Sequence, residues 1–105
     1  MSPEQRKIYE CAVVDAALSS GDISKLSIDI VRRVVDAFNN MKLRKHATIV
    51  SELITTDDTL TTDPYTIQAA HHRYIEQPPP SPRMMMSRYI LEHPAQFATP
   101  PTEER

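Results

Sequence analysis

Proline is distributed very unevenly along this chain. Seven of the nine prolines follow Gln77, and the single glycine, Gly21, lies far upstream. Because proline has no backbone N–H and its ring clashes with the preceding turn, the proline-rich run at residues 78–82 excludes helix and central strand. The sequence therefore predicts an all-α fold, with a small helical bundle over residues 1–77 and a proline-rich extended tail with one short helix over residues 78–105.

Start and stop signals place the first two helices of the body. Ser2 and Gln5 have the spacing of a capping box, with proline at the first helical position. This helix is expected to end near Ser19, where Gly21 can take the left-handed conformation of a C-cap. Ser27 is the expected N-cap of a second helix over residues 28–42, whose apolar residues share one half of the helical wheel.

Two further helices are expected in the body. Apolar residues between positions 47 and 54 form a helical stripe rotated by roughly 100° from that of the second helix, far more than the drift of a straight helix. A break between Asn39 and His46 is therefore predicted. Asp63 followed by Pro64 signals the start of a fourth helix, which must stop before Pro78. The tail has room for a short helix over residues 84–92.

The first helix is apolar on two faces. Tyr9, Ala12, Val13 and Ala16 form one stripe, and Cys11, Val14 and Leu18 form a second. Such a helix is central in a bundle or shared between the core and an interface. A body this small hides only about 60% of its unfolded surface, so we expect a protein partner or a second copy to cover the remainder. The residues predicted to bind it are Val14, Leu18, Val35, Met84, Met85, Tyr89 and Ile90.

Two roles are open for each part of the tail. The segment at residues 84–91 either folds back over the body or captures another chain, for which flexible methionine side chains are well suited. The proline run at residues 78–82 favours polyproline II, which serves equally as a stiff spacer or as a ligand for an aromatic groove.

No motif in the sequence indicates catalysis. Cys11 lies in mid-helix among apolar residues, where a cysteine is usually a small buried hydrophobe. The adjacent His71 and His72 point about 100° apart on a helix and cannot chelate one metal ion as an i, i+4 pair would. A single glycine also excludes a glycine-rich phosphate loop. We therefore expect no enzymatic activity, no cofactor, no metal site and no small-molecule substrate.

Charge favours a protein partner over nucleic acid. The formal net charge is −2, so bulk attraction to nucleic acid or to an anionic membrane is not expected. A lone cysteine and the lack of a long apolar run are typical of a cytoplasmic, soluble chain. The alternative is that the second helix and the helix after it form a helix-turn-helix-like unit that binds nucleic acid through cationic residues of the second helix and of the join that follows it. These residues are Arg32, Arg33, Lys42, Arg44 and Lys45.

The functional prediction is a small non-enzymatic protein–protein interaction module, a modulator or inhibitor of a larger assembly, that self-associates as a homodimer through helix faces. The alternative prediction is a small nucleic-acid-binding regulator of transcription or replication. Acidic residues that share the outer face of the second helix with its arginines count against this alternative, because a helix face of mixed sign is usually only solvated.

Overall fold

A computed structural model describes residues 2–97 of the chain, and all its regular elements are helices. The elements are α1 (Pro3–Ser20), α2 (Ile28–Asn40), α3 (Arg44–Ser51), α4 (Pro64–Ile75), α5 (Pro82–Glu92) and α6 (Pro94–Phe97). Within this part of the chain there is no strand, only an isolated bridge between Ile54 and Leu60. The all-α prediction is confirmed. The predicted end of the tail, from residue 98 on, lies outside the described residues.

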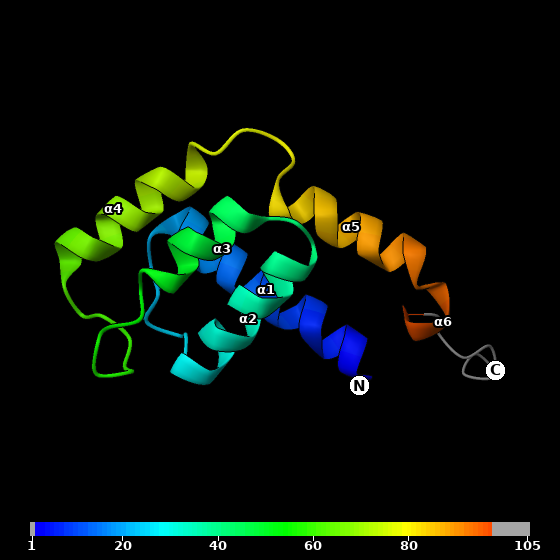
Figure 1. Cartoon of the computed structure of the whole chain (residues 1–105), viewed down its shortest axis with the longest axis horizontal. Coiled ribbons are helices and arrows are strands. Elements are labelled where there is room, and N and C mark those ends of the chain that lie inside the picture. Colours follow the sequence, from blue (N-terminus) through cyan, green and yellow to red (C-terminus); the bar gives the residue numbers. More distant parts are fainter. Residues whose placement is uncertain (1, 98–105) are drawn as a thin grey trace.

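α1 is the central element of the fold. It packs against α2, α4, α5 and α6, while α3 packs against α2 and α4. Figure 1 shows α4 and α5 at opposite ends of the molecule, joined by the yellow loop over the top, with α2 and α3 between them. The chain thus returns to α1 after α4. The hydroxyl of Ser2 donates to the carbonyl of Gln96 at 3.3 Å, which brings α6 to the start of α1.

The helix boundaries follow local signals in the sequence. The Ser2 hydroxyl accepts from the Gln5 amide at 3.1 Å, and the Gln5 side chain accepts from the Ser2 amide at 3.0 Å, which completes the capping box. Gly21 ends α1 with φ 83°, in the left-handed region. Ser27 and Asp63 accept from backbone amides at the starts of α2 and α4. These predictions are confirmed. The boundaries could be predicted from the sequence because each signal acts within one helical turn.

The predicted break after the second helix is also confirmed. α2 ends at Asn40, and Lys42 has φ 66°, which reverses the chain before α3 begins at Arg44. Leu43 precedes α3 and gives it no side-chain cap. Arg44 and Lys45 occupy the first turn of α3.

The prediction that the whole proline run at residues 78–82 is non-helical is wrong. Pro82 is the first residue of α5, so that helix begins two positions earlier than predicted. Ser81 caps it by accepting from the Met84 amide at 3.2 Å. Proline is tolerated at the first helical position because an N–H there has no partner within the helix. The same rule lets Pro94 open α6, a helix that the sequence had not indicated.

The core is shared by five helices. Its largest fully buried side chains come from α1, α2, α3 and the residue Leu53 just after α3, and are Phe38, Leu18, Ile49, Leu53, Val14, Val31, Val34, Val50 and Cys11. α4 adds Ala70 and Tyr74, and α5 adds Met86. The short helix of the predicted tail therefore packs in the same core as the body.

The prediction that Val14 and Leu18 bind a partner is wrong. They are 0% and 1% exposed, because the stripe that they form with Cys11 faces the core. The sequence showed two apolar stripes on α1 but not which one would face inward. No helix within residues 2–97 has both the length and the apolar character needed to cross a bilayer.

Candidate functional site

From residue 8 to residue 20 the outward face of α1 carries no charge. Within residues 8–20 the two ionisable carboxylates, Glu10 and Asp15, are both buried. Tyr9 is 59% exposed, Ala12 and Ala16 are exposed, and Val13 is half-buried. This apolar stripe, which we call the α1 outer face, comprises Tyr9, Ala12, Val13 and Ala16. This part of α1 thus reverses the usual arrangement of a surface helix, which turns its charges to water.

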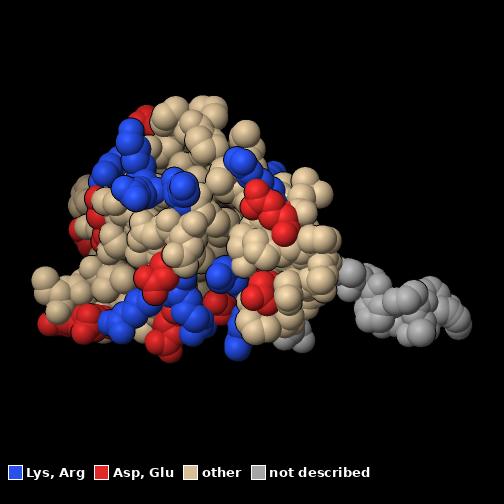
Figure 2. Space-filling view, turned by 45° about the vertical axis from the view of Figure 1, so that its right-hand side comes forward, with Lys and Arg blue, Asp and Glu red and all other residues tan. Residues whose placement is uncertain are grey.

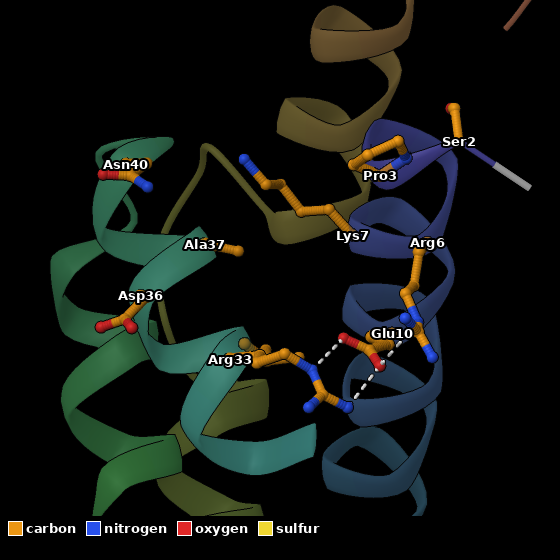
Figure 3. A pocket seen from close by; sticks show the side chains of 10 residues that line it. Ser2, Pro3, Arg6, Lys7, Glu10, Arg33, Asp36, Ala37 and Asn40 are labelled. Carbon is orange, nitrogen blue, oxygen red and sulfur yellow. Dashed lines mark hydrogen bonds and ion pairs between the residues drawn. The ribbon is translucent and has the colours of Figure 1, made fainter. Parts of the chain in front are cut away.

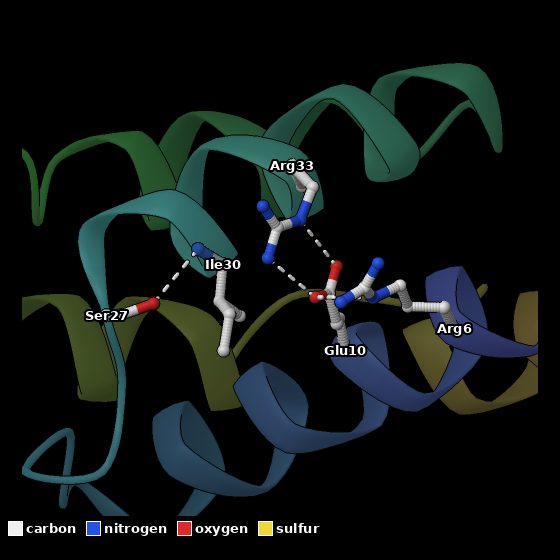
Figure 4. Close-up of polar contacts among 5 residues, drawn as sticks. All are labelled: Arg6, Glu10, Ser27, Ile30 and Arg33. Atoms are coloured by element: carbon white, nitrogen blue, oxygen red, sulfur yellow. Dashed lines mark hydrogen bonds and ion pairs between the residues drawn. The ribbon is translucent and has the colours of Figure 1, made fainter. Parts of the chain in front are cut away.

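Glu10 is neutralised inside the structure by two arginines. Arg33 of α2 donates from Nε and Nη2 to the two carboxylate oxygens at 2.9 and 2.7 Å (Figure 4). Arg6, one turn earlier on α1, lies 3.9 Å from the same carboxylate. The hydrogen bonds from Arg33 hold the pKa of Glu10 below its ordinary value, against the opposing effect of burial. This charge therefore joins α1 to α2 and does not serve as a base.

A groove of about 400 Å³ lies above this ion pair, between the first half of α1 and the second half of α2. Figure 3 shows Arg6 and Arg33 converging on Glu10 at its lower end, with Lys7 reaching across the opening. Lys7 Nζ lies 5.5 Å from the centre of the Tyr89 ring, a cation–π contact with α5. Because Glu10 is already held by two arginines, it is not available as a general base here.

A second buried polar cluster joins α1, α3 and α4. The Tyr74 hydroxyl donates to Asp15 Oδ1 at 2.8 Å. The His46 ring packs edge-on against the Tyr74 ring, with centroids 5.1 Å apart. Burial lowers the pKa of His46 and raises the pKa of Tyr74. Sequence reasoning missed this cluster, because Asp15 and Tyr74 are far apart in the chain and the only local signal was a carboxylate beside the inner stripe of α1.

The residues considered for catalysis or metal binding are either buried or engaged in hydrogen bonds within the chain. Cys11 is fully buried, and this burial raises the pKa of its thiol to about 12, so almost no nucleophilic thiolate forms at neutral pH. His71 Nδ1 lies 2.6 Å from the Leu18 carbonyl, and His72 Nε2 lies 2.9 Å from the Gln68 amide nitrogen. Among residues 2–97 no three His, Cys, Asp or Glu side chains are grouped closely enough to hold a metal ion.

The predicted partner residues outside α1 are divided between packing and exposure. Val35, Met85, Tyr89 and Ile90 are half-buried, and all except Ile90 are packed against the core. Met84 is 57% exposed. Leu91, the last residue of the segment at 84–91 that was expected to fold back or to capture another chain, is 79% exposed two turns further along α5. The helix therefore folds back on the body with one side and leaves the side of Met84 and Leu91 exposed.

The five cations of the nucleic-acid alternative do not form one patch. Arg32 Nη2 lies 2.8 Å from an oxygen of Asp58, and Arg33 binds Glu10. Lys42, Arg44 and Lys45 lie together and exposed at the join of α2 and α3, and none of them forms an ion pair with another described residue. On the face shown in Figure 2, basic and acidic side chains are interspersed over the lower half.

No family model, no characterised protein and no solved structure is significantly similar to this chain.

Proposed function

We propose that this chain is a small non-enzymatic protein–protein interaction module, a modulator or inhibitor of a larger assembly, that self-associates through the α1 outer face. The observation that carries the proposal is the reversed polarity of α1. Its two charges within residues 8–20 are buried, while Tyr9 is 59% exposed beside the exposed Ala12 and Ala16.

Burying Glu10 and Asp15 has an energetic cost, since a buried charge is tolerated only with compensating partners. The same arrangement leaves a strip of surface without any charge that would have to be desolvated on binding. Tyrosine is among the residues that contribute most at protein interfaces. The side chains of Ala12 and Ala16 are short enough to let another helix approach closely.

The strip is compatible with a second copy of itself. In an antiparallel pair of α1 helices centred between Ala12 and Val13, Tyr9 of each copy would meet Ala16 of the other, a large side chain against a small one. α1 has 18 residues and is therefore about 27 Å long. One such helix pair covers less than a standard interface, so we expect a dimer that dissociates at roughly micromolar concentrations.

A second contact is available on α5. Met84 and Leu91 lie two turns apart on the exposed side of this helix and are 57% and 79% exposed. Flexible methionine surfaces adapt to different partners. This side supports the modulator role, because it would remain open to a target while α1 is covered.

Sedimentation velocity over a concentration series tests the proposal. We expect Tyr9→Glu to weaken self-association at least tenfold, because it places a charge in the strip, where it would face Ala16 of the other copy. The matched control is Tyr65→Glu, since Tyr65 of α4 is 84% exposed and lies outside the strip. A chain that stays monomeric at several hundred micromolar, and that captures no protein from a lysate, would contradict the proposal.

A nucleic-acid-binding regulator remains the second candidate, on one observation. Lys42, Arg44 and Lys45 cluster around the start of α3, which has no side-chain cap. The free backbone N–H groups at a helix start can bind phosphate groups. Gel shifts at low and moderate salt, repeated with Arg44→Ala and Lys45→Ala, test it, because phosphate contacts make affinity fall steeply with salt. No retardation at low salt would remove this candidate.

A further inference from the structure

Asp15 is a buried carboxylate with few partners. It is 9% exposed, and its one hydrogen bond to another described residue is the 2.8 Å bond from the Tyr74 hydroxyl. None of the ion pairs within residues 2–97 includes it. Glu10, the other buried carboxylate of α1, is held by two arginines. Buried charges are ordinarily paired, so the environment of Asp15 calls for a cationic partner.

Asp15 lines a cavity of about 340 Å³, open to solvent on one side, at the junction of α1, α3, α4 and the start of α5. Two other polar side chains in its lining are more than nine-tenths buried, Tyr74 at 4% and His46 at 5% exposure. Ile75 and Pro82 add apolar surface. The space is about ten times the volume that one molecule occupies in liquid water, so the cavity can hold a small organic molecule.

The chemistry of the lining selects a cation that carries an apolar chain. A carboxylate attracts an ammonium group, aromatic rings favour a cation near them, and Ile75 and Pro82 can contact methylene groups. A bare metal ion is a poor match, because among the described residues no cluster of three metal-binding side chains surrounds the cavity.

We propose that this cavity binds an alkylammonium group, either a free primary amine or a lysine side chain, with Asp15 as the residue that pairs with its charge. The proposal is independent of self-association, because the lining residues Asp15, Tyr74 and His46 are buried and are not part of the α1 outer face.

One cation of the chain lies at the rim. Arg83 of α5 is exposed, lines the cavity and forms no ion pair with Asp15. It opposes the entry of a second cation. Arg83→Ala is therefore expected to bind an alkylammonium at least as tightly as the unchanged chain does.

Chemical-shift perturbation in amide NMR spectra tests the proposal with n-butylammonium as the probe. A ligand of this size is expected to bind with a Kd of order 1 mM, with shifts concentrated on the residues around the cavity. The neutral isostere n-butanol is the ligand control. N-acetyl-lysine methylamide, which stands for a lysine side chain in a protein, is titrated in parallel to distinguish the two sources. Tighter binding of this compound than of n-butylammonium indicates a lysine side chain, and weaker binding indicates a free primary amine.

Asp15→Asn removes the charge and keeps an oxygen that can accept from Tyr74, and we expect it to weaken butylammonium binding at least tenfold. Asp22→Asn is the matched variant, since it removes one carboxylate at an exposed position. Equal binding of butylammonium and butanol, or equal binding by the Asp15→Asn and Asp22→Asn variants, would overturn the proposal. Weaker binding by Arg83→Ala would overturn it as well, and this exposed substitution does not depend on how the Asp15 variant folds.

Discussion

Replacing Leu18 by alanine tests which of the two apolar stripes of α1 belongs to the core. Leu18 is 1% exposed and is among the largest fully buried side chains of the structure. The substitution removes three carbon atoms and leaves a cavity that the neighbouring helices can only partly fill. For buried leucines the transfer and cavity contributions together cost about 2.7–5 kcal/mol.

We expect a loss near 3 kcal/mol for Leu18→Ala, because helices of a small domain can partly close around the cavity. A domain of this size has a total stability of only about 5–15 kcal/mol, so the effect is large. Urea unfolding followed by far-UV circular dichroism measures it. With a typical slope for a small domain, the midpoint is expected to fall by roughly 2 M urea at an unchanged slope.

Tyr9→Ala is the matched variant on the opposite stripe. Tyr9 is 59% exposed, and we expect its removal to change the free energy of unfolding of the monomer by no more than about 0.5 kcal/mol. The measurement is made at a concentration at which the chain is monomeric. A loss below about 1 kcal/mol for Leu18→Ala, or an equal loss for both variants, would refute the assignment of the inner stripe.

Three further predictions concern buried polar groups. Tyr74→Phe removes the donor to the Asp15 carboxylate and should lower the free energy of unfolding by about 2 kcal/mol in urea titrations; an unchanged midpoint would contradict a stabilising role of this hydrogen bond. Burial lowers the pKa of His46 below its ordinary value of 6.5, so the unfolded chain takes up the proton first and stability should fall as the pH drops below 6.5. Thermal unfolding at a series of pH values should show a smaller fall for His46→Gln, and an identical fall would contradict this. Hydrogen bonds from Arg33 hold the pKa of Glu10 below 4.5, so this carboxylate contributes stability above 4.5 that is lost as the pH falls further. Arg33→Gln should lower the melting temperature at pH 7 and flatten its decline in acid, and an unchanged acid profile would count against the role of Arg33.

Most helix boundaries could be predicted because they are set by neighbouring residues. The capping box at Ser2, the left-handed Gly21 and the Asp63 cap all act within one turn, and the structure contains each of them. The error at Pro82 was also local. Proline disrupts the interior of a helix but is favoured at its first position, and Ser81 directly before Pro82 supplies the N-cap.

The candidate sites were harder to predict, because they depend on which elements meet. The sequence showed that Lys42, Arg44 and Lys45 are close along the chain, but not that Arg32 and Arg33 are engaged by Asp58 and Glu10. The pairing of Asp15 with Tyr74 joins residues that are far apart in sequence. Hydrophobic periodicity cannot predict such a contact, because the pattern of one helix contains only one of the two residues that meet.

The sequence by itself determined that the chain is helical, where most of its helices begin and that α1 has two apolar stripes. Tertiary structure alone decided that the stripe of Cys11, Val14 and Leu18 faces inward and that of Tyr9, Ala12 and Ala16 faces water. The physical reason is that helix formation depends on residues within one or two turns. Burial depends instead on where α2, α4 and α5 pack, and Arg33 and Tyr74 on those neighbours provide the partners that allow Glu10 and Asp15 to turn inward.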